Sequence, residues 1–188
     1  MADSTSKGVA VTTELRDYLI AHSITQPSIN SELVEATKAA MQGLAIMQIA
    51  EEQGPFLTWL ARLVGTRRAV EIGRPFWERA GVADRIDVVI GPAADTLAAF
   101  RPDEPIDFAF IDADKTGYQT YYDILLPMMR PGGIIAFDNA LYFGAVLTDS
   151  KDPDVLAIRE LNRSVANDAR VETVLLNVAD GLLLARKL

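Results

Sequence analysis

The stretch IDFAFIDADKTGYQTYYDILLPMMRPGGIIAFDN, residues 106–139, decides the fold of this chain. Apolar runs open and close it: IDFAFI and GGIIAF are typical of strands buried on both faces of a parallel sheet. The segment YQTYYDILLPMM between them has helical character. A strand, a helix and a second strand in this order predict a βαβ unit.

The alternation of strand and helix continues upstream, and the pattern changes downstream. RAVEIG at 68–73 and IDVVIG at 86–91 predict further buried strands. VETVLLNV at 171–178 and GLLLARKL at 181–188 predict two strands joined by the hairpin signal Ala179-Asp180-Gly181. We therefore predict an α/β fold, in which an antiparallel C-terminal strand closes a mostly parallel sheet.

Helical periodicity marks the N-terminal third of the chain. Segments 11–23 and 31–50, the second with a cap at Ser31, predict two helices, and Gly54-Pro55 opens a third. No repeat, low-complexity stretch or linker divides the sequence. We predict one domain over residues 1–188, with N-terminal helices at 1–66 and the sheet core at 67–188.

Composition narrows the possible functions. The chain has 188 residues, of which 49% are hydrophobic, enough to bury a core. Its formal net charge of −8 disfavours nucleic acid and anionic membranes as general partners. The lack of cysteine excludes disulfides, thiol catalysis and thiolate zinc sites, and the single histidine excludes sites that need two imidazoles. We see neither a signal-peptide pattern nor an apolar run of the ~20 residues of a membrane span, so we expect a cytoplasmic protein.

Polar side chains follow both strands of the βαβ unit. Asp112 and Asp114 come after IDFAFI, and Asp138 and Asn139 come after GGIIAF. Because parallel strands end at one edge of the sheet, where ligands bind in such folds, we expect the two sets to lie together. Their oxygens suit Mg²⁺ or Ca²⁺. At either strand alone, helix capping explains these residues equally well, but the pair of strands favours a site.

Lys115 lies between the two sets, three residues after Asp112. A lone lysine is most often a solvated surface residue. Beside a divalent cation, however, its ammonium form is disfavoured, so that the amine can act as a general base. The same cation acidifies a coordinated hydroxyl, and the two together would generate an oxygen nucleophile.

Two strand ends upstream have features of a nucleoside site. A carboxylate such as Glu71, at the end of RAVEI, can accept hydrogen bonds from a ribose diol, and Gly73 permits a tight turn with close ligand approach. Gly91-Pro92-Ala93 is a second tight exit, whose small residues leave room for a flat adenine ring. Taken alone, this second segment is more simply explained as an ordinary turn.

Four segments in a fixed order resemble the cation-dependent O-methyltransferases of the caffeoyl-CoA and catechol type. They are VEIG (70–73), WERAGVADRIDVVIGPAADTL (77–97), FIDADKTGYQTYYDILLPMMRPGGIIAFDN (110–139) and NVADGLLLARK (177–187). The resemblance runs from about Val11 to the C-terminus. It implies a Rossmann-like sheet, a homodimer, and transfer of a methyl group from S-adenosylmethionine to one hydroxyl of a vicinal diphenol. It also implies a divalent cation, Mg²⁺, Mn²⁺ or Ca²⁺.

The resemblance also implies a role for individual residues. Asp112, Asp138 and Asn139 would hold the metal, Lys115 would be the base, and Asp112 would also position the substrate. The S-adenosylmethionine contacts would be Gln48, Glu71, Gly73, Ala93 and Asp114, and the substrate rings would be lined by Tyr142 and Phe143.

One segment of the family pattern is absent. Glu71-Ile72-Gly73 runs directly into Arg74-Pro75 and then FWERAGV (76–82), which resembles the end of a later helix. The missing loop, helix and strand are about the size of one βαβ unit, roughly 30 residues. They would carry the rest of the glycine loop and the acidic residue that grips the cofactor ribose.

The missing segment leaves two functions open. One is the methyltransferase just described. The other is a truncated, catalytically impaired protein of the same fold that binds metal or phenol without methyl transfer. A nicotinamide dehydrogenase is a weaker third possibility, because only Gly73 stands where G-x-G-x-x-G would follow the first strand.

Overall fold

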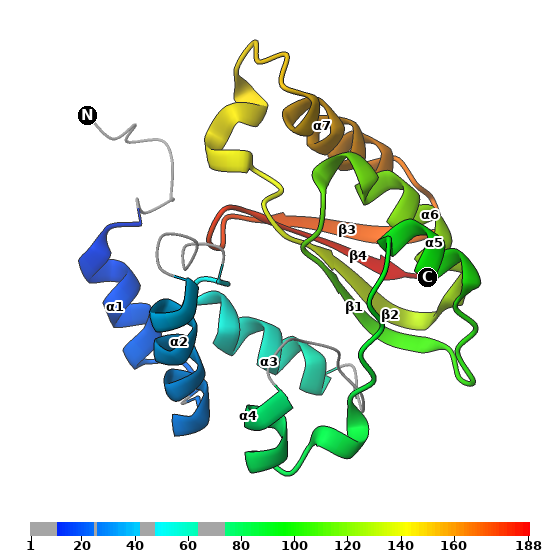
Figure 1. Ribbon diagram of the computed structural model, residues 1–188. Coiled ribbons are helices and arrows are strands. Elements are labelled where there is room, and N and C mark those ends of the chain that lie inside the picture. The colour runs from blue at the N-terminus through cyan, green and yellow to red at the C-terminus, as the bar shows by residue number, and fades with distance from the viewer. Residues whose placement is uncertain (1–10, 25, 42–47, 64–73) are drawn as a thin grey trace. The chain divides into compact units, whose positions relative to one another are not determined.

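Figure 1 shows the computed structural model of the chain, which describes residues 11–24, 26–41, 48–63 and 74–188. The chain forms two compact units, Met1–Trp59 and Leu60–Leu188. Within the described ranges, each helix is too short or too polar to span a membrane.

Helices make up the N-terminal unit: α1 (Thr13–Ala21), α2 (Ser28–Met41) and most of α3 (Gln53–Leu63). The hydroxyl of Thr12 caps α1 by accepting a hydrogen bond from the backbone N–H of Leu15 at 3.3 Å. A helix is confirmed in each of the three predicted segments, but residues 48–50, within the predicted range of the second, are not helical. The predicted cap at Ser31 is wrong, because α2 already begins at Ser28, where the N–H of Asn30 bonds to the carbonyl of Pro27 at 2.9 Å.

Among the described residues, four strands form a sheet in the order β1-β2-β4-β3. β1 (Ile106–Ile111) and β2 (Met129–Phe137) pair in parallel. β4 (Leu182–Lys187) runs antiparallel to β2, and β3 (Val171–Leu176) runs antiparallel to β4. The predicted βαβ unit, C-terminal hairpin and antiparallel closing strand are therefore confirmed.

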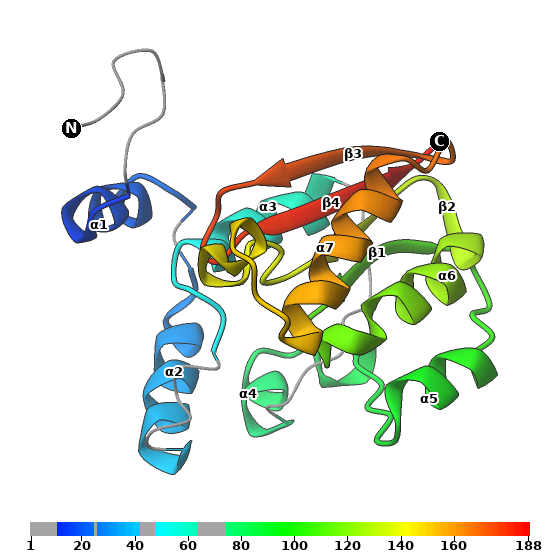
Figure 2. The same cartoon turned by 90° about the horizontal axis from the view of Figure 1, so that it is seen from above.

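Helices α5 (Ala93–Ala99), α6 (Tyr118–Met128) and α7 (Pro153–Ala166) lie over one face of this sheet (Figure 2). The buried side chains of α6 recur at helical spacing and face the strands: Tyr118, Tyr121, Tyr122, Leu125 and Leu126. Their packing anchors the start of α6, and with it the short segment after β1 that carries the predicted site residues.

Residues 86–90 depart from the prediction. They follow α4 (Arg74–Arg79) and a 3₁₀ turn at Ala83–Arg85, and they form no strand. The side chain of Ile90 is 94% exposed. A strand is stable only where its backbone N–H and C=O groups pair with a neighbour, and IDVVI pairs with none of the described strands. The prediction of a buried strand there is wrong, and RAVEI lies outside the described residues.

Candidate active site

Asp112 and Asp138 start side by side at the carboxyl edge of the sheet. They directly follow Ile111 and Phe137, which are partners in the parallel ladder of β1 and β2. Neighbouring strands lie about 4.8 Å apart. The backbone N–H of Asp138 donates to the carbonyl of Ile111 at 3.0 Å, which extends the ladder by one residue. The structure thus brings the two carboxylate-bearing positions together, as the topology predicts.

Lys115 begins a 3₁₀ turn at Lys115–Gly117 and points back toward these strand ends. Its Nζ lies 3.0 Å from Oδ1 of Asp112 and donates to the hydroxyl of Tyr118 at 2.7 Å. The side chain is only 12% exposed, so Lys115 is not a solvated surface lysine. We call Asp112, Lys115, Asp138 and Asn139 the strand-end cluster.

Tyr118 connects two members of the strand-end cluster. Its ring is fully buried, and its hydroxyl donates to the backbone carbonyl of Asp138 at 3.2 Å while accepting from Lys115. Burial first, and then the charges of Asp112 and Asp138, raise the pKa of Tyr118 well above its usual range, so the phenol stays protonated. The sequence did not predict these contacts of Tyr118, because helical spacing can indicate burial but not the partner of a hydroxyl.

Asn139 completes the strand-end cluster in a left-handed backbone conformation, with φ of 55°. Asparagine tolerates this region better than most residues. Its backbone N–H donates to Oδ1 of Asp138 at 2.8 Å, and its Nδ2 donates to Oδ2 of Asp180 at 3.2 Å. Since Nδ2 is held by Asp180, the amide oxygen Oδ1 points away from that carboxylate.

The donors of the strand-end cluster fit a hard divalent cation. Asp138 is 5% exposed, and a buried carboxylate is stabilised by nearby positive charge. Within the described ranges, no three or more Asp, Glu, His or Cys side chains gather into a metal-binding group. A cation at the strand-end cluster would have the carboxylates of Asp112 and Asp138 and the amide oxygen of Asn139 as its protein ligands, with substrate or water oxygens in its other positions.

Asp114 is fixed by its neighbours on the adjacent turn. The hydroxyl of Tyr121 donates to Oδ1 of Asp114 at 2.5 Å, and this hydrogen bond is the main cause that raises the pKa of Tyr121 to about 12. Gly117 allows the close approach, because a Cβ there would lie 2.6 Å from Oδ2 of Asp114 and 2.5 Å from the Tyr121 hydroxyl. Sequence reasoning did not find this pairing.

Of the other four predicted cofactor residues, the structure describes two, Ala93 and Gln48. Ala93 is exposed as the first residue of α5. Gln48 belongs to the N-terminal unit, where its Nε2 donates to the carbonyl of Val34 at 3.4 Å. Glu71 and Gly73 lie outside the described residues.

Tyr142 and Phe143 lie in the loop that follows the strand-end cluster. Both have positive φ, 46° and 52°, so the loop turns sharply at these side chains. The hydroxyl of Tyr142 donates to Oδ2 of Asp154 at 3.1 Å. Phe143 is 86% exposed, and its ring centroid lies 6.1 Å from that of Tyr142. An exposed aromatic ring next to the cluster is suited to cover a flat substrate.

Arg159 of α7 holds the far part of this loop. Its guanidinium donates to the carbonyls of Val146 and Ala145 at 2.9 Å each, to that of Ser150 at 3.1 Å, and to that of Thr148. One planar side chain therefore satisfies four backbone acceptors of a segment without regular strand or α-helix structure.

Substituting Arg159→Lys is expected to lower the free energy of unfolding by about 1–2 kcal/mol, because an ammonium cannot reproduce the planar fork and leaves carbonyls unpaired. Urea unfolding measures the change. Arg163→Lys on the same helix is the control, since the guanidinium of Arg163 pairs with the exposed Glu160, and it is expected to change stability by less than about 0.5 kcal/mol. Equal effects of the two substitutions would contradict the proposed role of Arg159 in holding this loop.

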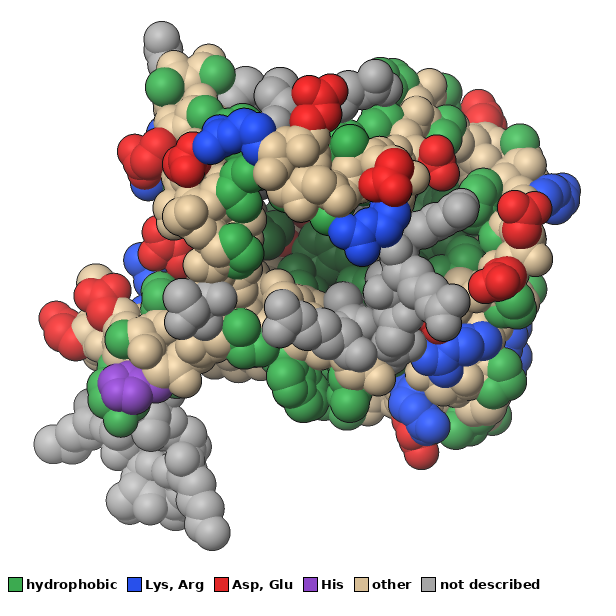
Figure 3. Space-filling view, turned by 90° about the horizontal axis from the view of Figure 1, so that it is seen from below, with side chains coloured by type: hydrophobic (Ala, Val, Ile, Leu, Met, Phe, Trp, Pro, Cys, Tyr) green, Lys and Arg blue, Asp and Glu red, His purple; other side chains and the backbone are tan. Residues whose placement is uncertain are grey.

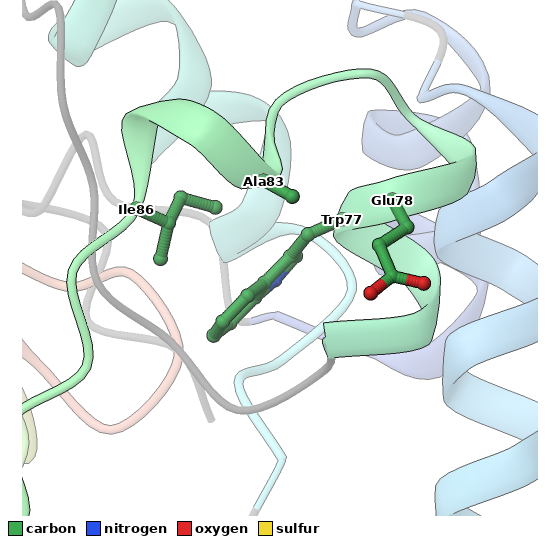
Figure 4. Close-up of a pocket in the computed structure, with 4 residues that line it drawn as sticks. All are labelled: Trp77, Glu78, Ala83 and Ile86. Atoms are coloured by element: carbon green, nitrogen blue, oxygen red, sulfur yellow. The ribbon is translucent and has the colours of Figure 1, made fainter.

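A small pocket of about 190 Å³ lies elsewhere in the same unit, between α4 and the 3₁₀ turn that follows it. Figure 4 shows the ring of Trp77 inside its lining, with Glu78, Ala83 and Ile86 around it. None of the predicted site residues in the described part of the chain lines this pocket. Acidic and basic side chains are interspersed on the face seen in Figure 3.

Comparison with known proteins settles the family. The family model described as "O-methyltransferase" matches residues 20–74 and 67–188. The chain belongs to this O-methyltransferase family. It is 33% identical to "Probable caffeoyl-CoA O-methyltransferase 1" of Dictyostelium discoideum over 210 residues, which cover 92% of this chain and 91% of the relative. It is 30% identical to the caffeoyl-CoA O-methyltransferase of Populus kitakamiensis over 228 residues, covering 97% of each.

Solved O-methyltransferase structures have the same fold. The O-methyltransferase from Bacillus cereus in complex with SAH superposes with a TM-score of 0.82 at 28% identity, covering 94% of this chain and 98% of that one. The predicted family and the Rossmann-like fold class are confirmed.

This O-methyltransferase chain is also shorter than its relatives, as predicted. An alignment of 210 residues uses only 92% of a 188-residue chain, so the Dictyostelium protein has residues that this chain lacks. The two stretches matched by the family model overlap at residues 67–74, and the predicted gap after Gly73 falls within this overlap.

Proposed function

We propose that this chain transfers a methyl group from S-adenosylmethionine to one hydroxyl of a catechol-like substrate, with the help of a divalent cation. The observation that carries the proposal is the strand-end cluster, in which Nζ of Lys115 lies 3.0 Å from Asp112, beside Asp138 and Asn139. The Bacillus cereus relative, solved with SAH, supports the choice of methyl donor.

Each member of the strand-end cluster has a role in this proposal. Asp112, Asp138 and Asn139 hold a Mg²⁺, Mn²⁺ or Ca²⁺ ion, which when bound would stabilise negative charge on the substrate oxygens. Lys115 takes the proton of the hydroxyl that receives the methyl group. Asp112 and the hydroxyl of Tyr118 hold Nζ of Lys115 in place, at 3.0 and 2.7 Å, so that the amine is already positioned when substrate binds.

The remaining proposed contacts surround the cluster. Asp114, fixed by Tyr121, accepts hydrogen bonds from the methyl donor. Gln48, Glu71, Gly73 and Ala93 are further donor contacts that the family resemblance supports. Tyr142 and Phe143 cover the substrate ring, and we propose that residues 1–188 act together as one methyltransferase domain.

The test is methyl transfer to a simple catechol. We expect labelled methyl to pass from S-adenosylmethionine to catechol in saturating Mg²⁺, and EDTA to abolish the reaction. Phenol is the matched control, since its single hydroxyl cannot chelate a cation and should remain unmethylated. If catechol gains no methyl under these conditions, the proposal is wrong.

A second function is supported by one observation, the chain's missing segment relative to its relatives. A protein that has lost part of the cofactor loop would bind metal or phenol without methyl transfer. Calorimetry separates the two: binding of S-adenosylmethionine supports the methyltransferase, and Mg²⁺ or catechol binding without it supports the truncated form.

A further inference from the structure

The tip of the β3–β4 hairpin, at Asp180 and Gly181, is hydrogen-bonded to the loop that follows the strand-end cluster. Backbone carbonyls at the tip accept from the loop: Gly181 from Ala140 at 2.9 Å, and Asp180 from Leu141 at 3.0 Å. The carboxylate of Asp180 accepts from the N–H of Phe143 through Oδ1 at 2.5 Å and from Nδ2 of Asn139 through Oδ2 at 3.2 Å. The tip therefore sets the path of this loop.

Gly181 makes this close contact possible. Its φ of +87° suits glycine, and a Cβ at this position would lie 2.4 Å from Cγ of Leu141 and 2.7 Å from its backbone nitrogen. The hairpin thus packs directly against the loop backbone, which leaves the Asp180 carboxylate little freedom to move.

We propose that Asp180 is a positioning residue that selects which end of the Asn139 amide is offered to the cation. The inference rests on the proposed function. A carboxylate only accepts hydrogen bonds, so it can pair with Nδ2 of Asn139 and not with Oδ1. The amide oxygen is then left for the cation, whereas an amide NH₂ group cannot ligate a hard cation. Asp180 does not itself touch the ion.

The variant Asp180→Asn is expected to reverse which end of the Asn139 amide faces the cation. The backbone N–H of Phe143 cannot change its direction, so it keeps the side-chain oxygen of residue 180 and leaves the new NH₂ group facing Asn139. Two NH₂ groups cannot bond to each other, and the Asn139 amide therefore flips and offers its own NH₂ to the cation. We expect Mn²⁺ to bind about 10–100-fold more weakly, the usual cost of losing an outer-shell partner.

Asp180→Ala is the matched control. It removes the same negative charge, yet it places no donor against Asn139, so that the cation can still draw the amide oxygen toward itself. We expect its Mn²⁺ affinity to fall only a few-fold and to lie between those of the wild type and Asp180→Asn. A purely electrostatic role of Asp180 predicts equal losses in the two variants.

Mn²⁺ binding to the full chain, followed by the paramagnetic resonance signal of free Mn²⁺, decides the matter without any activity measurement. Weaker binding in Asp180→Asn than in Asp180→Ala supports the inference. If the wild type binds Mn²⁺ and the two variants are equal, the inference is wrong and the proposed function stands. If the wild type binds no Mn²⁺, the proposed metal site fails and the inference with it. Loss of the metal-free fold in Asp180→Asn, seen by thermal unfolding, would assign Asp180 a structural role and also overturn it.

Discussion

Lys115→Met is expected to lower kcat for catechol methylation by about 10³-fold, within the 10²–10⁴ that a positioned general base contributes. Methionine retains an unbranched apolar stem that can pack beside Tyr118, over whose ring Nζ now lies at 4.8 Å, so the fold should persist. Only the amine that takes the proton is lost. Single-turnover methyl transfer measures the change, and the dissociation constant of S-adenosylmethionine should stay within about twofold, since that ligand is bound before proton transfer.

Lys115→Arg separates proton transfer from charge. Arginine keeps a positive group that can pair with Asp112, but it does not give up its proton in proteins, so this variant should be nearly as slow as Lys115→Met. Lys38→Met is the control, because Lys38 lies on α2 and pairs with the exposed Glu35. A rate close to wild type in Lys115→Arg would show that the cluster needs a cation at this position and not a base.

The sequence predicted that the residues of the strand-end cluster lie close together, because their proximity depends on features that are local in the chain. Two strands in parallel register deliver Asp112 and Asp138 to one edge, and Lys115 follows the first of them by three residues. Apolar runs and helical spacing fix those features over short distances in the chain. The same reasoning identified the helix α6 between the two strands.

The contacts that could not be predicted from the sequence join distant parts of the chain. Asp180 lies 41 residues from Asn139, and only the closed sheet, with β4 beside β2, brings the hairpin tip to the loop. The A-D-G turn predicted the hairpin but gave no sign of what its carboxylate contacts. IDVVI failed for the opposite reason: its residues have strand character, but a strand also needs a pairing neighbour, which no local pattern reports.

The second large effect is expected from Asp138→Asn. The amide keeps an oxygen that can accept the N–H of Asn139, a bond of 2.8 Å in the wild type, so the local fold should hold. The charge that we propose for metal binding is removed. Stabilisation by a bound cation is worth several kcal/mol, and each 1.4 kcal/mol is tenfold in rate, so kcat/KM in limiting Mg²⁺ should fall at least about 100-fold.

Titration with Mg²⁺ tells a metal ligand from a structural residue. If Asp138 binds the cation, higher Mg²⁺ should restore part of the activity of Asp138→Asn, and the Mg²⁺ concentration for half-maximal rate should rise. Asp123→Asn is the matched control, because Asp123 is exposed on α6 and an asparagine there can still accept from Gln119, now at 3.0 Å. A variant at Asp138 that is slow at every Mg²⁺ concentration, with an unchanged half-maximal value, would assign its carboxylate to positioning the strand end and not to the cation.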